Sequence, residues 1–360
     1  MRIGIDAREL SGHSTGVGRY LAGLLGEWAT ATYARRHDFV LYSHEPLALP
    51  LDARRFPTHV VKGRAGTLWE QLSLPAVAAK DHLDVFFAPA YTAPVVPHVR
   101  SVVAIHDLSF VAHPEWFTTR EGVRRRWLTR RTAARAAAVI TISQFSRREL
   151  IERLNVPDSR IHVIPPGITP IDSVPGAAEA PDAAPNVLFV GSIFRRRHVP
   201  DLIRAIALLG KRRPDVSLDL VGDNRTFPKE DIQRAMAVAG VEGRARWHRY
   251  VSDEALAALY GRARAFAFLS DYEGLGLTPL EALQHAVPPV LLDTPVARES
   301  CGDAAIYVRS PSIADMAAAL ETALFDQAAR GRVLGAVPSV LARYSWPRAA
   351  KDTMAVIESA

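Results

Sequence analysis

The residues best suited to chemistry lie in the segment 270–282, which reads SDYEGLGLTPLEA. This segment is predicted to contain the end of a strand, a glycine-rich loop and a helix that opens at Thr278. Free N–H groups of such a loop and helix start bind phosphate or sugar oxygens, and the carboxylates of Glu273 and Glu281 can accept hydrogen bonds from hydroxyls. A purely structural interpretation stays open for Glu281. Thr278-Pro-Leu-Glu281 also has the form of a capping box, with Pro279 at the first helical position.

A second candidate is the run Arg195, Arg196 and Arg197, which follows Gly191 at the end of another predicted strand. Guanidinium groups can clamp a diphosphate with paired hydrogen bonds and neutralise its charge as a bond breaks. A run of like charges is usually a solvated turn. Here its place at the carboxyl end of a strand, where open α/β sheets bind their ligands, favours a functional role.

A third candidate is the loop 12–20, GHSTGVGRY, between the first predicted strand and the first helix. Gly16 and Gly18 would let the backbone approach a ligand, and the helix start would offer N–H groups to an anion. A nicotinamide-binding fingerprint needs glycine or alanine where this chain has Leu21. Phosphate or sugar binding and a plain surface turn both stay open.

A fourth candidate is the pair His106 and Asp107, which ends a predicted strand of the first half. At a strand's carboxyl end, such a pair could bind a substrate or relay a proton in a cleft. A structural histidine is an equal alternative, because a lone histidine more often serves packing than chemistry.

These residues are positioned by a repeated strand–helix pattern, which predicts parallel sheets covered on both faces. Helices are expected at 18–29, 120–136 and 144–154, with Ser143 capping the last of them. The expected strands are 2–6, 39–43, 59–62, 84–88, 102–106 and 138–143 in the first half, and 186–191, 217–222, 246–250, 265–270, 287–292 and 304–308 in the second.

The chain of 360 residues fits two domains. Residues 1–170 form the predicted N-terminal domain and residues 186–344 the C-terminal one. The stretch 171–185 between them is rich in proline, alanine and acidic residues and has no apolar period, which is typical of a linker.

Composition excludes several other classes of protein. The single cysteine, Cys301, excludes an intramolecular disulfide framework and argues against a structural zinc site. No apolar run reaches eighteen residues, and the N-terminus reads directly into a strand, which predicts a cytoplasmic protein without a spanning helix. The net charge of +6 predicts attraction to phosphates or anionic surfaces, but no known nucleic-acid module is present.

Taken together, these segments resemble the family-4 glycosyltransferases with the GT-B fold, over nearly the entire chain. The resemblance is carried by IGIDARELSGHSTGVGRY, HDLSFVAHPEWF, AAVITISQFSRREL, VPPVLLDTPVARESCGDAAIYV and the Glu-x7-Glu motif formed by Glu273 and Glu281. It implies an α/β protein of two Rossmann-like domains with a cleft between them. It also implies that the last helix, at about 345–360, crosses back onto the first domain.

The resemblance further implies a role for each position that matches a family motif. Glu273 would contact the donor sugar, Glu281 the ribose, and His106 would lie close to the sugar. Arg197 stands where the family has a phosphate-binding lysine, while Ser192 replaces an arginine whose charge Arg195 or Arg196 would supply. The other implied contacts are backbone groups: Gly274, Leu275 and Gly276 to the sugar, Leu277 and Thr278 to the diphosphate, Gly16 and Gly18 to the diphosphate from the other domain, and Tyr250 and Val251 to the base.

The implied reaction is retaining transfer of a sugar, with mannose from GDP-mannose as the expected donor, to a glycan, lipid-linked or small-molecule acceptor. No metal or other cofactor is expected, since the chain has no Asp-x-Asp pair at a strand end. Basic residues around Arg124–Arg126, beside Trp116, Phe117 and Trp127, allow peripheral contact with the inner membrane face. The alternatives are a nucleotide-sugar epimerase on the same fold and a non-catalytic nucleotide-sugar-binding protein.

Overall fold

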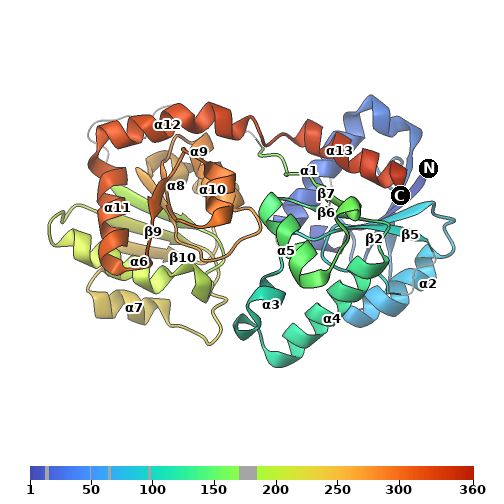
Figure 1. The fold of residues 1–360 in the computed structure, drawn as a ribbon, viewed down its shortest axis with the longest axis horizontal. Helices are drawn as coiled ribbons and strands as arrows, with labels where there is room; N and C mark the ends of the chain where they lie inside the picture. The colour runs from blue at the N-terminus through green and yellow to red at the C-terminus, as the bar shows by residue number, and fades with distance from the viewer. Residues whose placement is uncertain (13–15, 49, 64–65, 96–98, 170–184) are drawn as a thin grey trace. The chain divides into compact units, whose positions relative to one another are not determined.

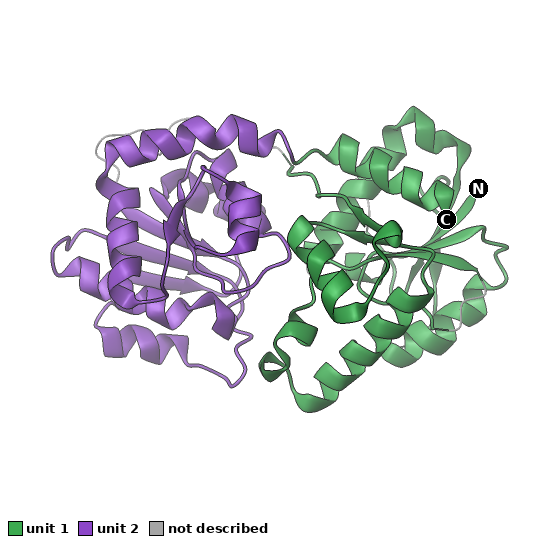
Figure 2. Cartoon of the chain, in the orientation of Figure 1, with its two compact units in different colours: residues 1–169, 344–360 green, residues 170–343 purple. Residues whose placement is uncertain are grey.

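A computed structural model describes residues 1–12, 16–48, 50–63, 66–95, 99–169 and 185–360 of the chain (Figure 1). The chain divides into two compact units, which Figure 2 colours separately. Unit 1 comprises Met1–Thr169 together with Tyr344–Ala360, and unit 2 comprises Pro170–Arg343. The expected linker at 171–185 lies, except for Pro185, outside the described residues.

Unit 1 is built on a seven-stranded parallel sheet in the order β3-β2-β1-β4-β5-β6-β7. The order reverses between β1 and β4, and such a reversal marks the edge where open α/β sheets bind ligands. Every residue of β4 is buried, as expected for a parallel sheet covered on both faces. The strands are β1 (Arg2–Asp6), β2 (Asp38–Ser43), β3 (Thr58–Val60), β4 (Val85–Ala88), β5 (Arg100–Ala104), β6 (Ala138–Thr141) and β7 (Ile161–Val163).

The helices of unit 1 cover both faces of this sheet. They are α1 (Gly16–Thr30), α2 (Leu74–Ala78), α3 (Ser109–Ala112), α4 (Thr119–Arg135), α5 (Gln144–Leu154) and α13 (Trp346–Ser359), with the one-turn helices η1 (Arg8–Leu10), η2 (Thr32–Arg36), η4 (Pro114–Trp116) and η5 (Asp158–Arg160) and the π-helical turn η3 (Trp69–Ser73).

The last helix, α13, packs in unit 1 beside α1 (Figure 1). The indole N–H of Trp28 on α1 donates to the carbonyl of Ala350 over 3.0 Å, and both residues are fully buried in one core. The helix that ends the sequence therefore belongs to the domain that begins it, as the family resemblance predicted.

Unit 2 repeats the plan with a six-stranded parallel sheet in the order β10-β9-β8-β11-β12-β13, which reverses between β8 and β11. Its strands are β8 (Asn186–Val190), β9 (Ser217–Val221), β10 (Ala245–His248), β11 (Ala265–Phe268), β12 (Pro289–Leu292) and β13 (Ile306–Val308). Its helices are η6 (Arg195–Arg197), α6 (Val199–Gly210), α7 (Ile232–Ala239), α8 (Asp253–Arg262), α9 (Leu277–Gln284), α10 (Pro295–Cys301), α11 (Ile313–Phe325) and α12 (Gln327–Leu341).

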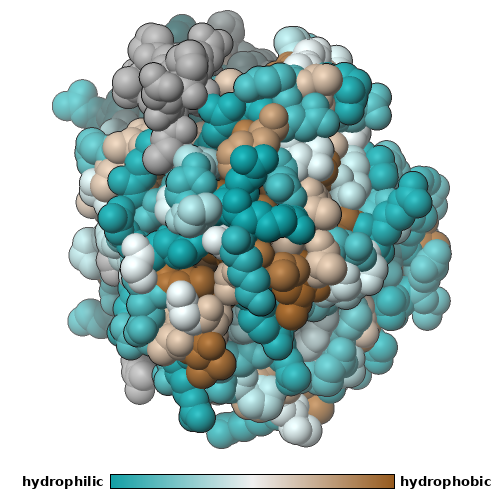
Figure 3. All heavy atoms as spheres, turned by 90° about the vertical axis from the view of Figure 1, so that its left-hand side faces the viewer, coloured by the Kyte–Doolittle hydropathy of each residue, from teal (hydrophilic) through white to brown (hydrophobic). Residues whose placement is uncertain are grey.

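The surface of unit 2 that Figure 3 shows carries hydrophobic side chains in small groups separated by hydrophilic ones. Scattered apolar residues of this kind are normal on a water-exposed surface. This face therefore suggests no docking site.

The two-sheet α/β fold predicted from the strand–helix pattern is confirmed, with three local differences. β5 begins at Arg100 and ends at Ala104, so His106 follows the strand and is not part of it. β7, a strand of three residues at the edge of the sheet, was not expected. The helix expected to open at Thr278 begins at Leu277, which changes the interpretation of Glu281.

Candidate active site

The predicted site residues of unit 2 gather where its strand order reverses. Two segments meet there, because β8 and β11 are neighbours in a parallel sheet and their carboxyl ends share one edge. The first is the turn η6, which carries the three arginines. The second is the segment 270–276, which we call the β11–α9 loop. The backbones fit closely at this edge, since a Cβ added at Gly222 would come within 2.0 Å of the Gly191 carbonyl oxygen.

Arg197 and Glu273 form an ion pair across these two segments. Arg197 Nε donates to Glu273 Oε1 over 2.8 Å, and Arg197 Nη1 donates to the Ser192 carbonyl over 2.8 Å. The guanidinium also lies over the Phe268 ring, with 4.7 Å from Cζ to the ring centroid. Only 12% of the Arg197 side chain is exposed, so this arginine is not part of a solvated turn, the usual structural interpretation of a run of like charges.

The Glu273 carboxylate is held in its ionised form. Burial acts to raise its pKa, but the charges of Arg197 and Arg196 and the hydrogen bonds from Arg197 and Ser270 lower the pKa below its usual range. The Ser270 hydroxyl donates to Glu273 Oε1 over 2.8 Å. This arrangement suits Glu273 to accept hydrogen bonds from hydroxyl groups.

The amino terminus of α9 follows directly on this loop. Gly276, with φ of +87°, precedes the helix without a side-chain cap, so Leu277 and Thr278 are its first two residues. Their N–H groups have no partner within the helix and point out of its positive end, which suits an anion. Among the described residues, the buried Thr278 Oγ1 also lacks a hydrogen-bond partner.

This start of α9 contradicts the capping-box interpretation of Thr278 and Glu281. Pro279 is the third helical residue, not the first, and Glu281 lies in the second turn, too far along the helix for the capping position. Its carboxylate instead accepts a long hydrogen bond of 3.4 Å from the hydroxyl of Tyr260, whose buried ring stacks on His285.

The remaining predicted residues of unit 2, whose expected contribution is through backbone groups, lie along the same sheet edge. Gly274 and Leu275 are buried in the β11–α9 loop. Tyr250 and Val251 follow β10, and the side chain of Tyr250 is 73% exposed. They lie just before α8, whose first turn is capped by Ser252.

The predicted residues of unit 1 lie at the carboxyl edge of its own sheet. Gly16 and Gly18 begin α1, and the residues 13–15 before them are outside the described part of the chain. His106 is buried, with Nε2 2.7 Å from the Pro89 carbonyl oxygen and its ring edge-on to Tyr20.

The environment of His106 sets its protonation state. A carbonyl only accepts, so Nε2 carries the proton, and burial lowers the pKa of the ring so that it stays neutral at pH 7. Asp107 accepts hydrogen bonds from the Tyr91 hydroxyl over 2.7 Å and the Ser109 amide over 2.8 Å. Asp107 thus forms hydrogen bonds with nearby residues of unit 1, and His106 is a neutral polar group.

His106→Ala is expected to reduce sugar transfer while nucleotide diphosphate binding is largely retained. Because the Pro89 carbonyl would lose its donor in a buried place, the free energy of unfolding should also fall by about 1–3 kcal/mol. Initial rates, nucleotide titrations and thermal melts of the variant check these effects. Near wild-type turnover would return His106 to a packing role. His59→Ala, at a half-buried histidine of β3, should change neither transfer nor nucleotide binding.

A buried charge cluster of unit 1 was missed by sequence reasoning. Arg8 lies 2.9 Å from Asp6 and 3.1 Å from Glu70, and both acids are almost fully buried. Burial, with the charge of Glu70, raises the pKa of Asp6 to about 6 against the opposing effect of Arg8. The segment DARE at the end of β1 was a usable signal for two of these residues, whereas nothing in the sequence singles out Glu70 in its π-helical turn.

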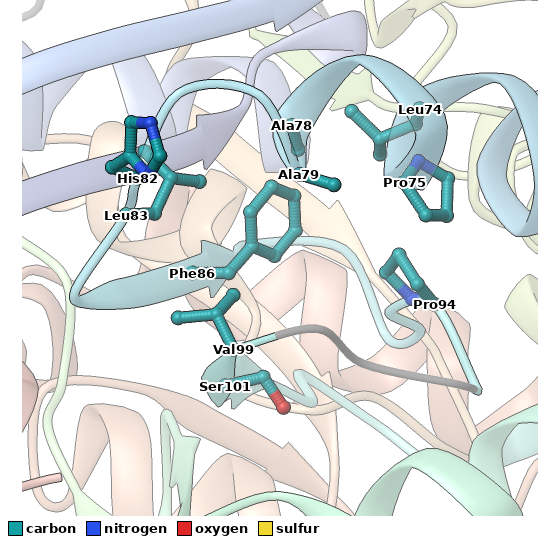
Figure 4. A pocket seen from close by; sticks show the side chains of 10 residues that line it. All are labelled: Leu74, Pro75, Ala78, Ala79, His82, Leu83, Phe86, Pro94, Val99 and Ser101. Atoms are coloured by element: carbon teal, nitrogen blue, oxygen red, sulfur yellow. The ribbon is translucent and has the colours of Figure 1, made fainter.

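A pocket of about 210 Å³ in unit 1 contains none of the predicted site residues (Figure 4). It lies between α2 and the sheet, and Leu74 and Phe86 contribute to an apolar lining. Among the described residues, no three His, Cys, Asp or Glu side chains are grouped so that they could hold a metal ion.

Comparisons with known proteins agree with the fold. The family model "Glycosyl transferases group 1" matches residues 173–333, and "Glycosyltransferase Family 4" matches residues 14–171. O-antigen chain mannosyltransferase B of Escherichia coli is 27% identical over 78% of this chain and 75% of its own length. Serotype-specific mannosyltransferase WbdA of Escherichia coli is 27% identical over 72% of this chain, but the match spans only 35% of that longer protein.

Among solved structures, HepE of Anabaena in complex with UDP and glucose superposes with a TM-score of 0.79, 18% identity and all of both chains covered. At that identity the likeness shows the fold alone, which is that of the GT-B glycosyltransferases. The two family matches together span most of the chain, and the chain belongs to glycosyltransferase family 4, as its motifs indicated.

Proposed function

We propose that this glycosyltransferase moves a hexose with retention from a nucleotide-sugar donor, with GDP-mannose as the favoured donor. The single observation that carries the proposal is the grouping of Arg197, Glu273 and the start of α9 at one edge of the unit 2 sheet. The mannosyltransferase relatives support the choice of mannose. HepE was solved with UDP and glucose, so a UDP-sugar is the main alternative donor.

In the proposed reaction, the diphosphate lies at the positive end of α9, within reach of Thr278 Oγ1 and the guanidinium of Arg197. Glu273 accepts a hydrogen bond from a hydroxyl of the sugar, and Glu281 accepts hydrogen bonds from the ribose hydroxyls. The acceptor oxygen bonds to the anomeric carbon, on the face from which the diphosphate oxygen departs. The bonding electron pair and the acceptor proton leave with the nucleoside diphosphate, whose charge the arginines and the helix terminus neutralise.

The identity of the donor is tested by measuring the melting temperature with a panel of nucleotide diphosphates and their sugars. A ligand that binds only the folded protein raises the melting temperature. GDP and GDP-mannose are expected to stabilise the protein more than UDP, dTDP or ADP and their sugars. Stabilisation by UDP or dTDP without GDP would reject GDP-mannose and leave the fold and reaction class standing. Donor conversion without acceptor would identify an epimerase, and failure to hydrolyse or transfer any bound donor would identify a binding protein.

Transfer is expected to proceed without a divalent metal. Arg197 and the α9 terminus supply the positive charge that a metal would otherwise bring to the leaving diphosphate. Initial rates with EDTA should equal those without it, and added magnesium or manganese should change them little. Loss of activity in EDTA with recovery on adding either ion would contradict this proposal.

The proposal includes peripheral contact with an anionic membrane through one surface of unit 1. On α4, Val123 and Trp127 are about half exposed, and Arg131 lies over the Trp127 ring. Arg124 donates to Thr67 Oγ1, which brings the start of the segment with the exposed Leu68 and Leu72 to α4. Apolar side chains among arginines suit an interface of acyl chains and anionic headgroups.

Trp116 and Phe117, the two other aromatic residues expected at this surface, pack against neighbouring rings. Trp116 stacks on His113 at 3.9 Å between ring centroids, and Phe117 is half-buried against Phe110. Among the described residues, no helix is long and apolar enough to span a bilayer. The membrane contact therefore rests on Trp127 and its neighbours.

The protein is expected to co-sediment with vesicles that contain phosphatidylglycerol, and much less with pure phosphatidylcholine vesicles. Binding should weaken as salt rises, because exposed charges are screened. Trp127→Ala should release most of the bound protein, whereas Val238→Ala, at an exposed apolar residue of α7 in unit 2, should bind like the wild type. Equal binding of the two variants would reject this surface.

A further inference from the structure

His198 lies between two carboxylates at the edge of the candidate donor site. It directly follows Arg197 and adopts a left-handed backbone conformation, with φ of +50°, between η6 and α6. Its Nδ1 is 3.0 Å from Asp201 Oδ2, and its Nε2 is 2.8 Å from Asp271 Oδ2. Only the doubly protonated ring can donate to both carboxylates at once.

Three consecutive side chains join the turn η6 to the β11–α9 loop. Arg196 Nε donates to the Tyr272 carbonyl over 3.2 Å, and Arg197 pairs with Glu273. His198 contacts Asp271, whose own amide donates to the Arg196 carbonyl over 2.9 Å. The loop that presents Glu273 is thus held to the turn that presents the arginines at three successive points.

We propose that His198 is a positioning residue of the donor site, whose charged ring holds Asp271 and thereby fixes Glu273 relative to Arg197. This inference rests on the proposed function, since the site it organises is that of the nucleotide-sugar donor. His198 itself does not need to touch the donor. His198 keeps the β11–α9 loop ordered before the donor binds, so that donor binding does not have to supply the free energy of ordering it.

The charges around the ring favour its protonated form. Asp201 on α6 and Asp271 in the β11–α9 loop face it directly, and Arg204 pairs with Asp201. Arg195 and Arg196 of η6 and Glu230, before α7, complete the charged surroundings, with Arg195 3.9 Å from Glu230. The hydrogen bond to Asp271 raises the pKa of His198 above its ordinary value, against burial and with further help from Asp201.

The direction of this change defines the pH range in which the contact acts. A histidine whose pKa is higher in the folded protein stabilises it fully below the unfolded value, about 6.5, and loses that contribution as the pH rises through the folded value. The contact is therefore fully present below about pH 6.5 and is lost as the pH rises above that value, through the pKa of the folded protein. A saturating donor can reorder the loop, so KM for the donor should rise there more than kcat falls.

The test is the affinity for GDP and for UDP, measured by calorimetry between about pH 6 and pH 9, the range that spans histidine titration. The wild type is expected to bind less tightly as the pH rises. His198→Gln should bind about three- to tenfold more weakly near pH 6, the effect of losing one charge-assisted bond at a partly exposed place, and should vary little with pH. His59→Gln, which alters a partly buried His–Asp pair of unit 1, should match the wild type in nucleotide binding.

A second variant keeps the test independent of how well His198→Gln folds. Asp271→Asn removes the charge that raises the pKa of His198, so the fall in affinity should shift to lower pH. Nitrogen chemical shifts of the His198 ring should show a titration midpoint above the ordinary histidine value in the wild type and a lower midpoint in Asp271→Asn.

Wild-type nucleotide binding together with an unchanged pH profile in His198→Gln would overturn this inference alone. A ring that titrates at or below the ordinary histidine value in the wild type would do the same. If the wild type bound no nucleotide diphosphate at any pH, the proposed function would fail, and this inference would fail with it.

Discussion

Replacing Arg197 by alanine is expected to lower kcat/KM by about 30- to 1,000-fold, because a lost charge-assisted contact to a leaving diphosphate costs about 2–4 kcal/mol of barrier. The same change removes the partner of Glu273 and leaves that carboxylate with less compensation in a mostly buried place. The free energy of unfolding should therefore also fall, by about 1–3 kcal/mol. Steady-state kinetics and denaturant melts measure the two effects separately.

Arg197→Lys separates the two roles of this side chain. Lysine keeps the positive charge near Glu273 but lacks the planar fork that also reaches the Ser192 carbonyl. Stability should be largely restored, while kcat/KM should recover only in part. Arg212→Ala, at an exposed arginine paired with Glu321, should change neither quantity appreciably. A well-folded Arg197→Ala protein with unchanged kcat/KM would remove the arginine from the phosphate site.

Glu281→Gln is expected to weaken donor binding at least tenfold while leaving the melting temperature unchanged. A carboxylate accepts two ribose hydroxyls through charge-assisted bonds that a glutamine side chain cannot both reproduce, a loss of about 1.5–3 kcal/mol. Stability should hold because the helix is not capped by this residue, and the amide oxygen of glutamine can still accept from Tyr260.

Calorimetric titration with the preferred donor and a thermal melt of the same sample check the Glu281 prediction. Tyr260→Phe provides a matched control, because it removes the hydroxyl that orients Glu281 but keeps the buried ring stacked on His285. It should weaken donor binding less than Glu281→Gln does. If Glu281→Gln bound the donor as tightly as the wild type, the ribose role would be wrong.

The sequence predicted the features that depend on local patterns. Apolar runs predicted twelve strands, and each lies within a few residues of an observed strand. Ser143 caps α5, as expected from its place before the helix. The sequence also placed Arg197 and the Glu273 loop each after a predicted strand, and they meet at one sheet edge because β8 and β11 are neighbours. The short edge strand β7 escaped because three residues carry too weak a pattern.

The features that were missed depend on conformation or on contacts between distant residues. Gly276 adopts a positive φ, so that α9 begins at Leu277, two residues before the start at Pro279 that the Thr-Pro pattern suggests. The local capping signal was therefore misleading. The pairing of Arg197 with Glu273, and of His198 with Asp271, joins residues more than seventy positions apart. Charge alone did not reveal that these arginines and acids would partner one another before any ligand binds.

The packing of α13 on α1 has a consequence for how the chain is made. A ribosome releases residues 1–169 long before residues 344–360, yet Trp28 needs Ala350 for its hydrogen bond, and the same core includes Met354 and Ile357. During synthesis the nascent first domain must therefore wait, with part of its apolar surface uncovered, while all of unit 2 is translated. Unit 2 is contiguous in sequence and can fold as it emerges, so it is expected to reach its native state first.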